Sequence, residues 1–463
     1  MLAPPNDAAV ANEVSLQLKE RFSAARGQSD ALFDLVRDES LYERPIPERH
    51  RIIFYIGHLE AFDWNLLNEN AAGFDLRSQN PALDRLFAFG IDPVGGGLPT
   101  DMPSDWPRLD VVRDYVNNVR RTLDATLERA ILDFGSQTHN GFSLRTLLNV
   151  AVEHRLMHVE TLAYMLHQLP LDMKIKAKDV LSTPQREAAA PVVGDMLPVP
   201  AGAVTLGLSR DAAAFGWDNE YQAHTVEVPD FAIDRYKVTN RQYLEFVAAG
   251  GYDIQAFWAE DDWNWKVARG ISHPKFWEKQ GEHSSDRGWF YRTMFDKIPF
   301  NESRVLDWPV YVSQAEAAAY ACWAGKSLPT EAEWQRAAYD TADGNTRPYP
   351  WGSEPPDSSL GNFDLHRWDP MPVNSFPQSQ STFGVQDILG NGWEWTSTAF
   401  APFPGFEPFP FYRGYSADFF DGKHFVMKGG SPRTAACMLR PTFRNWFQPH
   451  YQNVYVGFRC VKH

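Results

Sequence analysis

The sequence contains little cysteine, no excess of positive charge and no long apolar run. Its three cysteines, Cys322, Cys437 and Cys460, are too few for a disulfide framework or a four-thiolate zinc site. The 59 acidic residues outnumber the 44 lysines and arginines and give a formal net charge of −15, so the phosphates of a nucleic acid would be repelled. No apolar segment approaches the roughly 20 residues that cross a bilayer, and the N-terminal residues lack the basic-then-apolar order of a signal peptide. We therefore expect a cytoplasmic protein that binds neither nucleic acid nor a membrane.

Aromatic residues, by contrast, are abundant. They make up 14% of the 463 residues, include 16 tryptophans, and are concentrated in the second half of the chain. Large rings fill hydrophobic cores, and they also line ligand pockets. Composition alone favours the structural explanation and leaves the second one open.

The first part of the chain has the apolar spacing of helices. Apolar residues recur three and four positions apart in the segments 9–40, 48–70, 107–130 and 143–168, which predicts four helices over residues 1–170. Four helices of this length suit an antiparallel bundle, in which a site can be built from side chains on facing helices. The connection 71–106 is long and rich in glycine and proline, and such loops are often functional.

The remainder of the chain has a different texture. Residues 171–195 mix charge, alanine and proline without a sustained period, which predicts a linker. From 196 to 463 the sequence favours short strands and turns, with a helix from Ser313 to Ala324 that begins with the capping pair Ser313 and Glu316. Another helix should start at Thr330, with Glu333 in the equivalent position. The fold class expected is therefore α+β, with a helical domain followed by a mixed one.

Two histidines on the last predicted helix have metal-ligand spacing. His154 and His158 are four residues apart, so their rings project from one helix face and could chelate one ion. Glu160 lies off that axis and is a weaker candidate. His58 on the second helix could supply a third nitrogen, which would leave coordination positions open, as a catalytic metal requires. An isolated pair of this spacing is more often a surface or core feature, and spacing alone does not favour His58 over the alternatives, His139 and His167.

Together with these histidines, motifs across nearly the whole chain resemble the EgtB family. The motifs are Gly-His-Leu at 57–59, His-Arg-Leu-Met-His-Val-Glu at 154–160, WAGKSLPTEAEW at 323–334, GNGWEWTS at 390–397, KGGS at 428–431, RPTFRNW at 440–446 and GFR at 457–459. Members of this family are non-haem iron sulfoxide synthases of ergothioneine biosynthesis. The resemblance implies a DinB-like four-helix bundle followed by a formylglycine-generating-enzyme-type, C-type-lectin-like domain.

The resemblance also implies a cofactor, substrates and site residues. Fe(II) would be held by His58, His154 and His158 at the domain boundary, and O₂ would be used to join a sulfur donor to the imidazole ring of hercynine, the trimethylated betaine of histidine. Asn445 and Trp446 match the family segment that holds hercynine, and an aromatic wall suits a trimethylammonium group. Tyr412 and Tyr415 match a tyrosine pair in one branch, whose first member is the catalytic proton donor.

Departures from the family pattern concern the donor. Met157 stands where the family usually has a glutamine that hydrogen-bonds the hercynine imidazole, and Phe447 stands where one branch has an acid for the donor's amino group. Leu86-Phe87 leads to Gly90-Ile91 in place of a tyrosine pair, and the stretch 95–104 contains no arginine, although the γ-glutamylcysteine-using branch has two arginines there. Without arginine a site holds a dianionic peptide poorly. We therefore favour an uncharged selenosugar as the donor, as in selenoneine synthase (SenA), and place Met157 and Phe447 in the substrate site.

Three alternatives remain open at this point. The chain could be an ergothioneine sulfoxide synthase that uses cysteine or γ-glutamylcysteine. It could generate formylglycine, but that chemistry needs a copper-binding cysteine pair close after the Gly-Gly-Ser segment, where only Cys437 is present. It could also be a non-catalytic module that binds a betaine or a sugar.

Overall fold

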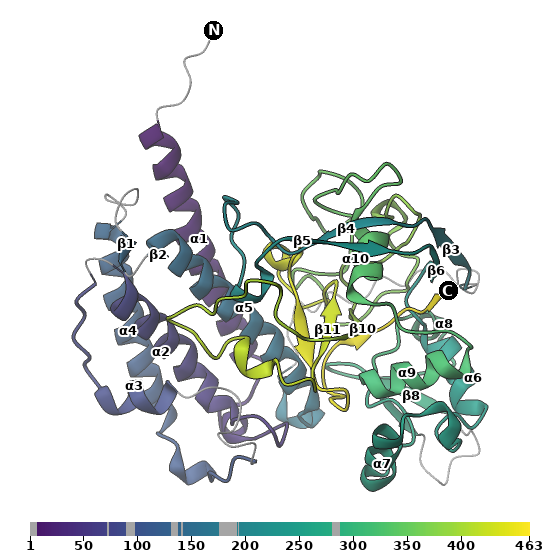
Figure 1. Cartoon of the computed structure of the whole chain (residues 1–463). Coiled ribbons are helices and arrows are strands. Elements are labelled where there is room, and N and C mark those ends of the chain that lie inside the picture. Colours follow the sequence, from purple (N-terminus) through teal and green to yellow (C-terminus); the bar gives the residue numbers. More distant parts are fainter. Residues whose placement is uncertain are drawn as a thin grey trace. The chain divides into compact units, whose positions relative to one another are not determined.

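The computed structural model describes residues 7–71, 74–88, 98–130, 138–139, 142–175, 192, 194–279 and 288–463. The chain divides into two compact units, Met1–Ala177 and Lys178–His463 (Figure 1). Among the described residues, no helix has both the length and the apolar character needed to cross a membrane.

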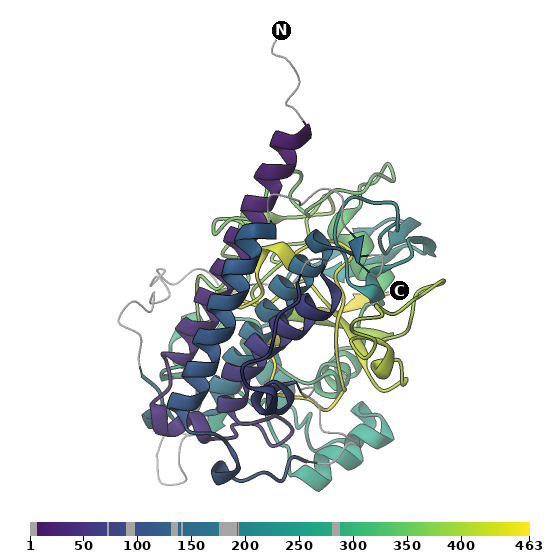
Figure 2. The same ribbon diagram turned by 90° about the vertical axis from the view of Figure 1, so that its left-hand side faces the viewer.

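Four long helices make up most of the N-terminal unit. They are α1 (Asp7–Phe33), α2 (Ile52–Asn70), α4 (Leu109–Ala130) and α5 (Leu144–Gln168). Helix α1 packs on α5, and α2 packs on both α4 and α5, while ion pairs such as Arg26 with Asp124 join α1 to α4 (Figures 1 and 2). The shorter elements are η1 (Asp38–Tyr42), α3 (Pro81–Phe87), η3 (Pro103–Asp105), β1 (Thr138–His139), β2 (Phe142–Ser143) and η5 (Leu171–Met173).

The four predicted helices are present, but two predicted limits are wrong. The helix expected over 9–40 ends at Phe33, because the next residues form a turn in which Val36 makes a bridge with Lys174. Leu35 and Val36 are nevertheless buried. Because these apolar residues continue the spacing of the helix, the sequence pattern predicted a longer helix than the structure has. The helix expected from 48 begins at Ile52, after a turn in which the Arg49 N–H bonds the Ile46 carbonyl.

The loop expected over 71–106 contains a short helix, α3. Its start has a recognisable signal, since the Asn80 side chain accepts from the Leu83 N–H and Pro81 occupies the first turn. The predicted linker 171–195 begins with the short helix η5. Most of that linker, residues 176–191 and 193, lies outside the described residues, as do Gly90 and Ile91.

The C-terminal unit contains small sheets joined by long connections. A four-stranded sheet has the order β12 (Asn445–Phe447), β11 (Phe425–Lys428), β10 (Trp393–Ala399), β13 (Val456–Gly457), with the last pair parallel. A three-stranded sheet has the order β14 (Val461–Lys462), β6 (Phe231–Asp234), β3 (Met196–Val199). The other strands are the hairpin β4 (Gly202–Leu206) and β5 (His224–Val228), and the antiparallel set β7 (Trp277–Lys279), β8 (Trp289–Arg292) and β9 (Lys297–Pro299).

Short helices occur between these strands. They are α6 (Asn240–Ala248), α7 (Glu260–Arg269), α8 (Ser303–Leu306), α9 (Gln314–Trp323) and α10 (Glu331–Tyr339), with the 3₁₀ turns η6 (Asp218–Glu220), η7 (Gln255–Phe257), η8 (Pro377–Ser379), η9 (Ala417–Phe419) and η10 (Ala436–Met438). The two predicted capping boxes are confirmed at α9 and α10. Ser313 caps α9 with Glu316, and Thr330 caps α10 with Glu333.

The motif at 390–397 is the buried centre of this unit. Glu394 on β10 is fully buried and accepts two hydrogen bonds of 2.7 Å from Arg459. The Trp334 indole N–H donates to the same carboxylate at 2.8 Å, and the Lys237 ammonium lies 3.2 Å from it. A buried charge is costly unless it is paired in this way, so Glu394 of this motif and Arg459 of the Gly-Phe-Arg motif at 457–459 depend on each other.

Candidate metal centre and aromatic cluster

Three histidines converge inside the N-terminal bundle. His58 comes from α2, and His154 and His158 come from α5. Their ligand nitrogens all lie within 4.8 Å of one another, and the three residues are only 3–5% exposed. The Nε2 atoms of His154 and His158 are 3.2 Å apart, as expected for rings one helical turn apart on the same face.

The ring of His58 is oriented by the chain that ends α3. Its Nδ1 lies 2.8 Å from the carbonyl oxygen of Phe87, and because a carbonyl only accepts, Nδ1 carries the proton and Nε2 keeps its lone pair. Residue 57 must be glycine for this approach, since a Cβ there would lie 2.4 Å from the Phe87 ring. Such a hydrogen bond from the non-ligating nitrogen is the usual way in which a metal-binding histidine is oriented.

The histidine cluster is electrically neutral near pH 7. Burial lowers the pKa of His58 to about 4, although the hydrogen bond to Phe87 opposes this shift. Burial also lowers the pKa of His154 and of His158 well below the usual value, and neighbouring imidazoles and Arg155 add to the effect. All three rings therefore offer lone pairs at physiological pH, which is the form that binds a metal.

The geometry fits a divalent transition metal. Two nitrogens that each lie about 2.1 Å from one ion, at an angle near 100°, are about 3.2 Å apart, which is the separation of the two Nε2 atoms. Three neutral imidazoles suit first-row metals such as iron, and they leave coordination positions for substrates.

The other candidate ligands are not part of this group. Within the described residues, the group contains histidines only. Glu160 and His167 are buried on α5 but do not belong to it, and the side chain of His139 lies outside the described residues. Met157 is half-buried between the two histidines of α5.

A network of buried charges adjoins the histidines, and the sequence reasoning missed it. Arg155, which follows His154, lies 2.6 Å from Asp63 and 3.0 Å from Glu60. Both acids are fully buried on α2, and Arg120 from α4 also pairs with Glu60 at 2.8 Å. The signal was available, because charged residues inside otherwise apolar helical segments are buried only with partners.

The predicted aromatic site residues of the C-terminal unit form a cluster. The rings of Tyr412 and Tyr415 are 5.4 Å apart, and Tyr415 meets Trp446 edge-on at 5.5 Å. Trp217 stacks on Tyr415 at 4.1 Å and is a member that the sequence reasoning missed. We call Trp217, Tyr412, Tyr415 and Trp446 the aromatic cluster. Phe400 stacks on the Trp446 ring at 4.1 Å.

Asn445 and Phe447 flank Trp446 on the short strand β12. Adjacent residues of a strand point to opposite faces, and the ring partners agree, since Phe447 stacks on Tyr451 at 4.9 Å. The Asn445 side-chain oxygen accepts from the Trp446 N–H at 2.9 Å. The structure thus brings Trp446 to the aromatic cluster and Phe447 to a different ring.

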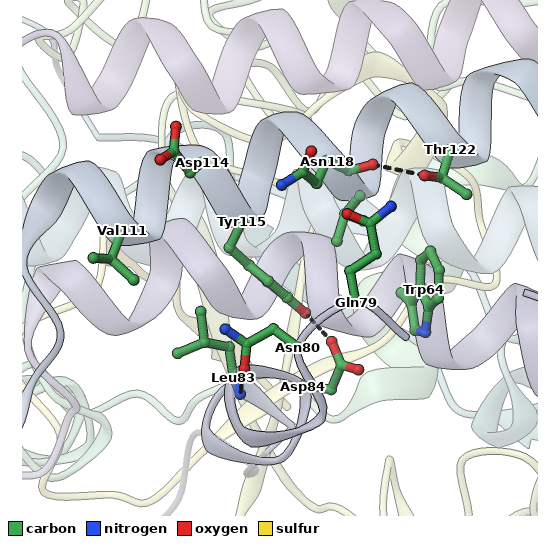
Figure 3. A pocket seen from close by; sticks show the side chains of 11 residues that line it. Trp64, Gln79, Asn80, Leu83, Asp84, Val111, Asp114, Tyr115, Asn118 and Thr122 are labelled. Atoms are coloured by element: carbon green, nitrogen blue, oxygen red, sulfur yellow. Dashed lines mark hydrogen bonds between the residues drawn. The ribbon is translucent and has the colours of Figure 1, made fainter. Parts of the chain in front are cut away.

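A cavity of about 230 Å³ lies elsewhere in the bundle, between α2, α3 and α4 (Figure 3). Trp64, Leu83 and Tyr115 line it, and the Tyr115 hydroxyl donates to Asp84 at 2.9 Å. None of the predicted site residues lines this cavity.

Comparison with known proteins identifies both parts of the chain. Residues 182–463 match the sulfatase-modifying factor enzyme 1-like domain, and residues 21–162 match the DinB superfamily. The predicted fold class, a DinB-like bundle plus a domain of the formylglycine-generating type, is confirmed. The formylglycine-generating enzyme of Mycobacterium tuberculosis is 31% identical over 304 residues, which cover 58% of this chain and 97% of that protein.

Other relatives match more of the chain or at higher identity. The hercynine oxygenase of Mycobacterium tuberculosis is 39% identical over 258 residues, which cover 55% of this chain and 58% of that relative, less than two thirds of its length. The hercynine oxygenase of Mycolicibacterium smegmatis is 36% identical over 392 residues, which cover 82% of this chain and 83% of that protein. The predicted resemblance is confirmed by these matches: the chain belongs to the hercynine oxygenase, or EgtB-type, family of enzymes.

Proposed function

We propose that this chain is an Fe(II)- and O₂-dependent enzyme that joins a selenium or sulfur donor to the imidazole ring of hercynine. The observation that carries the proposal is the group of three buried, neutral imidazoles in a member of the hercynine oxygenase family. Fe(II) bound there would supply the means to activate O₂ beside the two substrates.

The overall reaction balances with one O₂. A donor R–XH, where X is sulfur or selenium, and the ring C–H of hercynine lose their two hydrogens, and a C–X bond forms. One oxygen atom is added to X and the other leaves as water, so O₂ accepts four electrons. No other oxidant or reductant is needed.

Residues of both units have roles in this proposal. His58, His154 and His158 hold the metal. Asn445, Trp446, Tyr415, Met157 and Phe447 bind the substrates, and the Tyr412 hydroxyl donates a proton. Tyr412 and Trp446 are half-buried, which leaves part of each ring accessible, and an aromatic face suits the trimethylammonium group of hercynine.

The donor is proposed to be a selenosugar, because the arginines that contact the loop before α4 are already engaged. Arg51 lies 3.1 Å from the carboxylate of Asp101, and Arg44 pairs with the same group. The Trp106 indole N–H donates to Asp101 at 2.7 Å. Both guanidinium groups already bind a carboxylate of the protein, which supports a donor without carboxylates. Cysteine or γ-glutamylcysteine, the substrates of an ergothioneine sulfoxide synthase, are the alternatives.

Formylglycine generation is the second candidate, because the similarity to such an enzyme covers nearly all of that relative. The three cysteines argue against it. Cys322 is exposed, Cys437 is half-buried and Cys460 is fully buried. The metal-ligating group found among the described residues consists of histidines.

A parallel assay of donors tests the proposal. The purified chain, loaded with Fe(II) without air, receives hercynine and O₂ with a selenosugar, cysteine or γ-glutamylcysteine, and products are identified by mass spectrometry. We expect the selenosugar to give the fastest turnover. A higher rate with γ-glutamylcysteine would overturn the selenosugar assignment, and hercynine binding without any turnover would indicate a non-catalytic module.

A further inference from the structure

The turn from Trp217 to Glu220 is among the most deeply buried segments of the C-terminal unit. Its four residues, Trp217, Asp218, Asn219 and Glu220, are each at most 1% exposed. The last three form η6 between β4 and β5. Three consecutive polar side chains without solvent are costly unless each has a specific partner, and their partners lie about 200 residues further along the chain.

One set of partners belongs to the segment that carries the two tyrosines. The Ser416 hydroxyl donates to the Asp218 carboxylate, and the Asn219 amide donates to the Ser416 oxygen at 3.0 Å. Trp217 stacks on Tyr415, with ring planes 27° apart. The position of Tyr415, and of Tyr412 three residues before it, is therefore tied to this turn.

The other set belongs to the segment that leads to Trp446. Arg440 donates to Glu220 at 2.8 Å, and the Thr442 hydroxyl donates to the same carboxylate at 2.5 Å. The carbonyl of Asn219 accepts from Arg444 at 3.4 Å. Three of the six residues before Trp446 are thus bound to two neighbouring residues of the turn.

Other buried charges also hold the segment that leads to Trp446. The Lys428 ammonium donates to the carbonyls of Pro441 and Phe443, each at 2.8 Å. Arg444 makes two hydrogen bonds, of 2.9 and 3.1 Å, to Glu331 at the start of α10. Charge-assisted bonds of this kind are short and directional, so the backbone that precedes Trp446 has little freedom.

We propose that the Trp217–Glu220 turn is a positioning element that fixes Tyr412 and Tyr415 relative to Trp446. This inference rests on the proposed function, in which those residues contact hercynine and its donor. Side chains on loops and short strands need such support to stay in productive geometry. Glu220 and Asp218 are positioning residues that act through the aromatic cluster, because they bind the segments that carry Trp446 and Tyr415.

Glu220→Gln tests the proposal, and Asp340→Asn is its matched control. Asp340 is likewise buried, at 2% exposed, and its carboxylate also accepts from one arginine and one threonine, Arg336 at 3.5 Å and the Thr346 hydroxyl at 2.8 Å. Its partners lie on and after α10 and include no residue of the aromatic cluster. Both variants weaken a buried arginine pair, but only one of these pairs holds the Trp446 segment. Thr442→Val, which removes a single hydroxyl bond to Glu220, is a milder variant of the same contact.

The first readout needs no substrate. In protein labelled with 5-fluorotryptophan, the ¹⁹F resonance of Trp446, assigned with Trp446→Phe, should shift or broaden in Glu220→Gln and in Thr442→Val. It should stay unchanged in Asp340→Asn. An unchanged Trp446 resonance in both Glu220 and Thr442 variants would overturn the proposal.

The second readout connects the turn to hercynine. Calorimetry on the Fe(II)-loaded chain without donor should show at least a tenfold weaker affinity for hercynine in Glu220→Gln, since small displacements of positioning groups have large effects. Iron content should equal that of the parent chain. If the parent chain itself did not bind hercynine, the proposed function would fail, while the resonance shift would still decide whether the turn positions Trp446. If the resonance shifted and hercynine bound equally well, the link to the substrate would be wrong.

Discussion

The histidine cluster and the aromatic cluster are held in place in different ways. His58, His154 and His158 project from α2 and α5, two long helices in which the backbone bonds are made within each element. Tyr412, Tyr415 and Trp446 lie in turns and on a three-residue strand, and contacts with segments distant in sequence fix them. The bundle thus supplies rigid side chains from regular structure, whereas the C-terminal unit obtains rigidity from buried hydrogen bonds between its loops.

Buried ion pairs support both clusters, but their arrangement differs. In the bundle the ions share helices with the histidines, since Glu60 is two residues after His58 and Arg155 directly follows His154. In the C-terminal unit, Glu220 is about 220 residues from its partner Arg440. Damage to the bundle network should therefore reach the metal ligands directly, while damage at Glu220 should spare them.

The largest expected effect follows from removing a histidine of the cluster. His154→Ala should abolish stoichiometric iron binding and lower turnover at least a hundredfold, because loss of a mere outer-shell partner already costs about 10–100-fold. His167→Ala is the matched control, since His167 is buried on the same helix but lies outside the group. Metal analysis and product formation measure both variants. Equal iron content in the two would refute the three-histidine site.

The next largest expected effect is a loss of stability when the buried charges beside the histidines are disrupted. Arg155→Met leaves Glu60 and Asp63 without their shared partner, and removing one member of a buried pair costs about 3–5 kcal/mol. Arg113→Met is the control, because its pair with Asp38 is exposed and such pairs contribute at most about 1 kcal/mol.

Denaturant unfolding followed together with iron content measures this difference. We expect Arg155→Met to lose iron as well as stability, and Glu220→Gln to keep its iron. If Arg155→Met kept full iron occupancy, the bundle network would be independent of the histidines, and the contrast between the two units would not hold.

The sequence predicted the helical half of the site better than the loop half. The spacing of His154 and His158 on one helix face is a local property, so it could be read directly. The choice of His58 over His167 as the third ligand could not be read from the sequence, because it depends on which faces of α2 and α5 meet. The capping boxes at Ser313 and Thr330 were predictable for the same local reason.

The aromatic cluster could be assigned only through family resemblance. Nothing in the local sequence around Trp217 indicates that it will stack on Tyr415, which is 198 residues away, because the contact is made by tertiary folding. The helix limit at Phe33 failed for a related reason. Leu35 and Val36 are buried by packing against later residues, including Lys174, and local periodicity does not contain that information.

The smallest expected effect concerns pH, and the two units should respond in opposite directions. Burial raises the pKa of Asp218 to about 6, above that of an unfolded aspartate. The unfolded chain therefore releases this proton first, and Asp218 makes the free energy of unfolding fall as pH rises from about 4 to 6, by at most about 1.4 kcal/mol per pH unit. Asp218→Asn keeps an acceptor for Ser416 but removes the titration, so the variant should gain stability relative to the parent across this window.

The metal-free histidine cluster should change the free energy of unfolding with pH in the opposite direction. Its pKa values are lowered, so the unfolded chain binds protons first and stability falls as pH drops below about 6.5. Urea unfolding of the parent chain and Asp218→Asn at pH 4, 5, 6 and 7, followed by a probe in each unit, separates the two effects. If the difference between the two proteins did not change with pH, the pKa of Asp218 in the folded chain would equal that of an unfolded aspartate, because only a difference between the two states makes stability depend on pH. Hydrogen bonds to the Asp218 carboxylate, including the one from Ser416, would then offset the cost of burying its charge.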